Sequence, residues 1–502
     1  MTNASAGHRE STPMAESTTR LSGNLSATAL VLSVLAFSAP IVTVSGYIAF
    51  AIGFVGQSAP LAWVIATAGL AIFAVGYTTM TRHIQRPGAF YAYITEGLGK
   101  TPGLGGAYLA TVSYMLINVG IYTFSGVMVS AAVKGVGGPS IPWWLCTAAG
   151  WILITTLGHF QIELSAKVLG AVMVLEVILV AVFNAFVLAK GGESGLSAAP
   201  LDPTKFFNAG TGLALLFAFG NFIGFEATAL YRDEVREPNK TVPRATYLAV
   251  FLIGGFYAVS AYSLIIAYGS GAPDRAANDP TTMFDHAMAT YVSASLANIT
   301  LVLVATSALA SVLSTHNVAA RYLQNLGADR ALPAFLAGVH PAHKSPYRAS
   351  AVNAVVVGVL LTFAAVLIPD ETMIIGAGSG IGTAGVLTLM ALVSFAVFRY
   401  FARTGRPATE TVWRVTIAPL IGSAVLAAVV IFAIIRFDLL VGGEPGQNIW
   451  MLLILVVVIA AGCIVAQYMK RNRPELFARL GRVEGDDTSP EPTGDARAHE
   501  PV

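Results

Sequence analysis

The chain has 502 residues, of which 55% are hydrophobic and only 11% are charged, and its formal net charge is +2. Soluble globular chains carry about 25% charged residues, so this chain has too few charges to cover a water-facing surface. The absence of a basic stripe argues against a nucleic-acid partner. Two cysteines, each in an apolar run, predict neither a disulfide framework nor a metal site.

Membrane-crossing helices require about 20 mostly apolar residues each, and the chain contains twelve such runs. The runs are continuously apolar, whereas strands of a transmembrane barrel would alternate. With both ends in the cytoplasm, 24 of the 29 Lys and Arg residues lie on the cytoplasmic side and 5 lie outside, as the positive-inside rule requires. An all-α membrane protein is therefore predicted, with spans at about 25–54, 60–81, 104–133, 142–160, 165–189, 209–230, 246–268, 292–321, 349–369, 372–400, 411–437 and 447–469.

The two ends of the chain are polar. Residues 1–24 are rich in Ser and Thr and lack the basic and apolar pattern of a signal peptide. Within the tail 470–502, the part after Leu480 becomes acidic and Pro-containing, which is typical of disorder. Both segments are predicted to be cytoplasmic, and the protein is predicted to lie in the inner or plasma membrane.

The first span contains a helix-breaking position. Pro40 removes a backbone donor and clashes with the preceding turn, and Ser38, Thr43, Ser45 and Gly46 surround it. A break at membrane depth frees main-chain N–H and C=O groups, which are tolerated where they face protein or a wet cavity. A simple proline kink is the alternative interpretation.

A second candidate break lies in the sixth span. Gly220, Asn221 and Gly224 interrupt an aromatic run that continues to a carboxylate, Glu226. Breaks in spans one and six, five helices apart, are typical of inverted-repeat transporters. There, half-helix N-termini bind a substrate carboxylate and half-helix C-termini offer carbonyls to a cation.

Two carboxylates and a run of glycines also lie inside spans. Glu176 lies within the fifth span and Glu226 within the sixth. An intramembrane carboxylate is costly unless paired, hydrated or protonated, so each is a candidate proton or cation carrier, or else a structural hydrogen-bond partner.

In the tenth span, small residues at close spacing predict tight helix packing; these are Gly376, Gly378, Gly380, Gly382 and Gly385.

These residues resemble the amino acid–polyamine–organocation (APC) permease superfamily. The resemblance spans about residues 25–470. Four stretches carry it: the first-span break 38–46; Arg86 to Tyr93; Phe222 to Glu226 continuing through Asp233 to Ala245; and Ala320 to Ala349. The third of these, 222–245, is the most specific.

The resemblance implies a leucine-transporter-like fold. Spans one to five (25–189) and six to ten (209–400) would form inverted 5+5 repeats with helices one and six broken, followed by two C-terminal helices (411–469). The substrate would lie between spans one, three, six, eight and ten. Its implied binding residues are Ile41, Thr43, Val44, Ser45, Gly46, Ala218, Phe219, Gly220, Asn221, Phe222 and Gly224.

Some positions depart from the family pattern. Some proton-coupled relatives carry a lysine in the fifth span, and the matching position here is Glu176. An acid cannot replace a cation, so Glu176 is open to three roles: binding a proton, holding a cation or facing a cationic substrate.

Glu226 matches the acid of pH-linked gating in relatives. Phe219 and Phe222 are the candidate gates.

The sequence thus predicts a secondary active transporter, proton-linked or Na⁺-linked, that moves an amino acid by alternating access. An amine or polyamine permease and an amino-acid exchanger are the alternatives. No cofactor or resident metal is predicted. The chain lacks a nucleophile–base pair at membrane depth and the H-E-x-x-H spacing, which argues against an enzyme. A transport-like sensor or a partner subunit of another assembly is a third class.

Overall fold

The computed structural model describes residues 38–84, 89–160, 166–225, 237–340, 345–368, 370–442 and 444–480. Every regular element within these ranges is helical, so the predicted all-α class is confirmed. The predicted polar segment 1–24, Glu226 and the tail from residue 481 lie outside the described residues.

Ten helices in the described ranges are long and apolar enough to cross a membrane, and each falls at one of the predicted spans. The predicted ranges 142–160 and 209–230 hold shorter apolar helices. Several helices extend past the predicted ends, because polar residues continue a helix beyond its apolar part. The span helices are α3 (Ile48–Val55), α4 (Pro60–His83), α6 (Lys100–Gly135), α7 (Trp143–Phe160), α8 (Ala166–Lys190), α9 (Thr211–Gly220), α11 (Pro238–Tyr268), α14 (Ala294–Ala328), α15 (Tyr347–Leu367), α16 (Glu371–Thr404), α17 (Ala418–Ile435) and α19 (Leu453–Asn472).

Shorter helices connect or cap the spans. In the first span, α2 (Pro40–Val42) and a π-helical turn (Thr43–Tyr47) precede α3, and a second π-helical turn (Trp413–Ile417) precedes α17. The other short helices are α5 (Ala89–Leu98), α12 (Ala272–Asn278), α13 (Met283–Tyr291), α18 (Asp438–Val441) and α20 (Pro474–Arg479). Helix α5 lies between the predicted spans 60–81 and 104–133, and its Phe90, Tyr93 and Ile94 side chains are buried.

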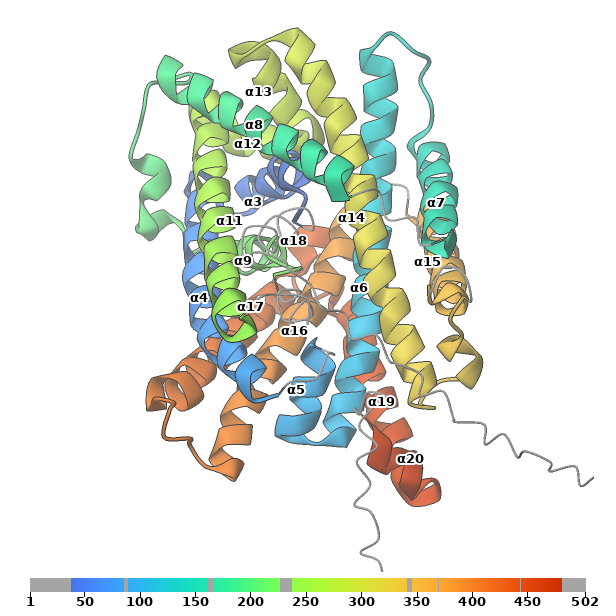
Figure 1. Ribbon diagram of the computed structural model, residues 1–502. Helices are drawn as coiled ribbons and strands as arrows, with labels where there is room; N and C mark the ends of the chain where they lie inside the picture. Colours follow the sequence, from blue (N-terminus) through green and yellow to red (C-terminus); the bar gives the residue numbers. More distant parts are fainter. Residues whose placement is uncertain are drawn as a thin grey trace, which may run out of the picture.

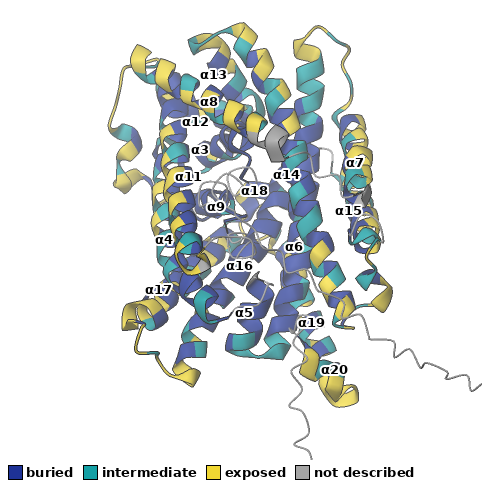
Figure 2. Cartoon of the chain, in the orientation of Figure 1, coloured by how far each residue is buried: buried dark blue, intermediate teal, exposed yellow. Residues whose placement is uncertain are grey.

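The helices form a bundle around α6, α14 and α16, with α7 and α15 side by side at its edge (Figure 1). Helix α16 is the most enclosed candidate span, with 78% of its most apolar stretch buried, whereas the corresponding value for α15 is 28%. Figure 2 shows exposed faces along α7, α8 and α15 and a buried centre. Those exposed faces are apolar, which is what lipid requires of the outside of a membrane bundle.

The contact between α6 and α16 depends on glycine. A Cβ atom at Gly378 would stand 2.8 Å from the Gly120 backbone nitrogen, and one at Gly382 would stand 2.6 Å from the Ser113 carbonyl oxygen. The two backbones therefore approach more closely than any side chain permits. The predicted tight packing of the glycine-rich span is confirmed.

Candidate functional site

The first span is interrupted at Ala39. This residue has φ 45° and ψ 72°, in the left-handed region, and Pro40 begins the next helix at its first position. The fixed ring of proline suits that position because no intrahelical hydrogen bond is lost there. The Thr43 N–H bonds the Ala39 carbonyl at 3.1 Å. The break lies just ahead of the predicted segment 41–46, which continues as α2 and the π-helical turn.

The sixth span is interrupted after Gly220. Helix α9 ends there, and turns continue to Phe225 with N–H···O bonds from Phe222 to Phe219 and from Ile223 to Gly220, at 3.2 and 3.0 Å. Gly224 has φ 108°, a conformation that L side chains rarely adopt. The chain therefore leaves the helix within the predicted glycine-containing motif.

One hydroxyl group joins the two interruptions. Ser38 Oγ donates to the Asn221 carbonyl oxygen at 3.1 Å. Ser38 Oγ also lies 2.5 Å from the Tyr257 hydroxyl oxygen of α11. These groups are buried, where a satisfied hydrogen bond avoids the desolvation cost of an unpaired polar group. The two breaks are thus one continuous structural feature.

A cavity of about 50 Å³ lies beside this link. That volume holds a few water molecules. Residues of the first-span break, α6, α9 with its following turn, α14 and α16 surround it. The wall is apolar apart from hydroxyl groups and one amide, and its residues are Ser38, Ala39, Val42, Tyr47, Ile117, Ile121, Phe217, Gly220, Asn221, Ile223, Ser311, Thr315 and Thr383.

Two predicted binding residues, Gly220 and Asn221, line this cavity. The others lie around it without lining it. Gly46 faces the Phe124 ring, Phe219 packs against Gly69, and Ser45 Oγ donates to the Ile41 carbonyl at 2.7 Å. The remaining predicted residues are buried in the surrounding packing or in the backbone turns: Ile41, Thr43, Val44, Ala218, Phe222 and Gly224.

The aromatic residue of α9 at the cavity is Phe217. Its ring centroid lies 5.5 Å from that of Tyr47 and 6.0 Å from that of Phe54. Further lining residues could have been predicted from helical spacing in the sequence, because residues four positions apart lie on one face of a helix. Ile117 with Ile121 on α6, and Ser311 with Thr315 on α14, follow that spacing.

Glu176 lies close behind the first-span break. Its side chain is buried, and Ser307 Oγ of α14 donates to its Oε2 at 3.0 Å. The fifth span thus places a carboxyl group near the first-span break, one turn of α14 away from the cavity residue Ser311. No contact of Glu226 is described, since it lies outside the described residues.

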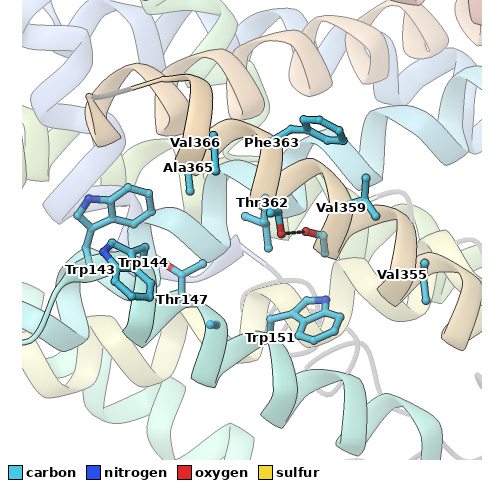
Figure 3. Close-up of a pocket in the computed structure, with 13 residues that line it drawn as sticks. Trp143, Trp144, Thr147, Trp151, Val355, Val359, Thr362, Phe363, Ala365 and Val366 are labelled. Atoms are coloured by element: carbon cyan, nitrogen blue, oxygen red, sulfur yellow. Dashed lines mark hydrogen bonds between the residues drawn. The ribbon is translucent and has the colours of Figure 1, made fainter.

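A larger groove of about 850 Å³ lies between α7 and α15 (Figure 3). Three tryptophans, Trp143, Trp144 and Trp151, form one wall, and Val359 and Val366 are among the aliphatic residues of the other. Trp151 Nε1 is already bonded to the Ala354 carbonyl at 3.0 Å. The lining of the groove includes exposed apolar residues of both helices, such as Trp144, Val355 and Phe363, and no charged residue. It is suited to lipid chains, whereas the small cavity has the polar groups of a solute site.

Residues 23–463 match the amino acid permease family. The chain belongs to that family. The resemblance to APC permeases is thereby confirmed, and the chain is a multi-pass membrane protein of a transporter family.

Relatives among known proteins are transporters too. The low-affinity putrescine importer PlaP of Escherichia coli K12 is 24% identical over 322 residues, which cover 62% of this chain and 68% of the importer. The uncharacterized transporter Rv1999c of Mycobacterium tuberculosis is 27% identical over 347 residues, covering 68% of this chain and 69% of that protein. This permease therefore shares most of its length with proteins named as transporters.

Proposed function

We propose that this permease is a secondary active transporter that moves a small solute bearing an amino group across the cell membrane by alternating access. The observation that carries the proposal is the Ser38–Asn221 hydrogen bond, which joins the two interrupted spans beside a cavity with polar wall groups. Interrupted helices at a repeat interface are the usual setting of a transporter's substrate site.

The proposed architecture is the one expected from the sequence. Residues 25–189 and 209–400 form two inverted repeats of five spans each, 411–469 add two helices, and the segments 1–24 and 470–502 are cytoplasmic. The twelve apolar helices at the expected positions support this arrangement. Alternating access would then consist of one set of helices rocking against the other around the cavity.

Two substrate classes have support. The family description favours an amino acid. The name of PlaP, a putrescine importer, favours an amine without a carboxylate. Substrates of both classes carry an ammonium group. Its N–H groups can donate hydrogen bonds to the side-chain oxygens of Ser38, Asn221 and Thr315 in the cavity wall. Proton linkage through Glu226 stays a prediction from the sequence.

The test is uptake into proteoliposomes of labelled amino acids and amines, with and without an imposed pH gradient. We expect uptake of at least one member, increased by the gradient. Ser38→Ala should reduce uptake at least ten-fold, because it removes the group that joins the two breaks.

Ser423→Ala is the matched control. Ser423 Oγ also donates to a backbone carbonyl of another helix, Ala391, at 3.0 Å, but Ser423 does not line the cavity. Its uptake should stay within two-fold of the unmodified protein. If folded protein takes up no member of the panel, the proposed function is contradicted. If Ser38→Ala and Ser423→Ala lose uptake equally, the cavity is not the substrate site.

A further inference from the structure

We propose that three arginines around the connection between α16 and α17 bind the phosphate group of an anionic phospholipid. They are Arg82, near the end of α4, Arg406, in the connection itself, and Arg414, in the π-helical turn that precedes α17. None of them lines the small cavity or the tryptophan groove. The proposal therefore goes beyond transport and names a lipid ligand for the outside of the bundle.

The three arginines converge on one buried residue, Glu410. Arg82 Nη2 lies 3.2 Å from Glu410 Oε1, and Arg414 Nη1 lies 3.5 Å from Glu410 Oε2. Arg406 Nη1 donates to the Glu410 backbone carbonyl at 3.0 Å. Glu410 is only 5% exposed, so it holds the arginines from the protein side. Segments far apart in the sequence thus bring their positive charges to one place.

The cluster carries more positive than negative charge. Three guanidinium groups surround a single carboxylate, and among the described residues these arginines form no ion pair with any other carboxylate. His83 Nε2 lies 3.5 Å from Glu410 Oε1 and adds a further cation when it is protonated. Like charges held this close repel one another, and a bound anion would relieve that repulsion.

The accessible arginines lie where the apolar surface of α17 begins. Arg406 is exposed, and the Arg414 side chain is 47% exposed. Beside Arg414, Val412 and Trp413 are 50% and 45% exposed, and Ile417 continues the exposed apolar surface. Tryptophan is enriched at the level of the lipid headgroups. The positive charges therefore lie at headgroup level, next to a surface suited to acyl chains.

An anionic phospholipid fits both parts of this surface. Guanidinium groups present their N–H donors in a planar fork that matches phosphate oxygens. Basic pockets between membrane helices on the cytoplasmic side bind anionic lipid headgroups, and the distribution of Lys and Arg predicts that this end of the bundle is cytoplasmic. A free phosphate ion would leave Val412, Trp413 and Ile417 uncovered, whereas the acyl chains of a lipid would cover them.

The experiment measures lipid binding to the full chain in neutral detergent by native mass spectrometry. The probes are phosphatidylglycerol, which carries a net negative charge, and phosphatidylcholine, which does not, with identical acyl chains. We expect phosphatidylglycerol to bind about ten-fold more tightly, because each arginine near the headgroup adds to its affinity. Excess glycerol 3-phosphate, the soluble headgroup anion, should leave this binding unchanged.

The double variant Arg406→Gln with Arg414→Gln should bring the two lipid affinities within about two-fold of each other. Its matched control is Arg471→Gln with Arg473→Gln, which removes the same charge from two exposed arginines at the end of α19. The control should retain the preference for phosphatidylglycerol, because these arginines are not part of the Glu410 cluster.

Four results would overturn the proposal. They are equal affinities for the two lipids in the unmodified protein, a preference unchanged in the folded Arg406→Gln, Arg414→Gln protein, equal losses in both double variants, and displacement of phosphatidylglycerol by glycerol 3-phosphate, which would assign the cluster to a free anion. If the double variant does not fold, Arg414→Gln alone should narrow the preference about three-fold or more. An unchanged preference in that variant overturns the proposal as well.

Discussion

Replacing Gly378 by alanine tests whether the approach of α6 and α16 depends on the missing side chain. The added methyl carbon would stand 2.8 Å from the Gly120 nitrogen and 3.0 Å from the Leu116 carbonyl oxygen. Ordinary contact begins at 3.4 Å, so the helices must separate by about 0.6 Å at this point. Both neighbours are backbone atoms, which cannot rotate away. Overpacking of this kind costs about 1–3 kcal/mol.

Gly255→Ala is the matched control. Gly255 also lies inside a helix, α11, but no atom lies within 4 Å of the position its Cβ would take. Alanine gains about 1 kcal/mol over glycine in a helix, and this gain cancels between the two variants. The difference in their free energies of unfolding should therefore be about 1–3 kcal/mol, with Gly378→Ala the less stable.

The measurement is reversible unfolding in mixed micelles with a denaturing detergent, followed by fluorescence. Uptake should fall in Gly378→Ala as well, because Ile117 of α6 and Thr383 of α16 both line the cavity. A Gly378→Ala protein as stable as Gly255→Ala would refute the reasoning that these backbones touch.

Two further predictions concern charged groups at the ends of the bundle. Glu410→Ala should lower the free energy of unfolding by about 1–3 kcal/mol, because Glu410 is buried and its Oε1 lies 3.2 Å from Arg82 Nη2, which would lose this ion pair. The same unfolding assay checks this, and Glu444→Ala, at an exposed carboxylate, should cost less than about 0.5 kcal/mol. Desolvation, helped by Asp279, raises the pKa of Asp285 in α13 from 3.8 to about 6. The folded state thus favours the protonated form, so its stabilising effect is complete below pH 3.8 and is lost as pH rises through 6. Asp285→Asn should flatten the fall in melting temperature over this window, and an unchanged pH profile would assign the fall to other groups.

The positions of the helices could be predicted from the sequence because a helix in lipid requires a long run of apolar residues. Each apolar run predicted a helix that the structure contains, including the short α7 and α9. The ends were less predictable, since α11 begins at Pro238, eight residues before its predicted apolar part. Helix α5 was missed because its apolar residues are too few to resemble a span.

The site could be predicted only as a region. Pro40 and Gly220 marked where the main chain is interrupted, but Ser38, which joins the interruptions, bonds a residue 183 positions away. Glu176 likewise accepts a hydrogen bond from Ser307, which lies 131 positions away in the sequence. A single sequence contains no signal for such pairs, because they depend on how distant helices pack. That is why the sequence left three roles open for Glu176.

The small volume of the cavity has a consequence for how tightly this permease can hold its cargo. A space of about 50 Å³ holds a few waters, which is less room than an amino acid or a diamine requires. If the substrate binds in this cavity, binding must coincide with expansion of the cavity. The free energy of that expansion opposes binding, so the apparent dissociation constant of the substrate rises as the expanded form becomes rarer. Mutations that destabilise the closed form should therefore lower the apparent dissociation constant.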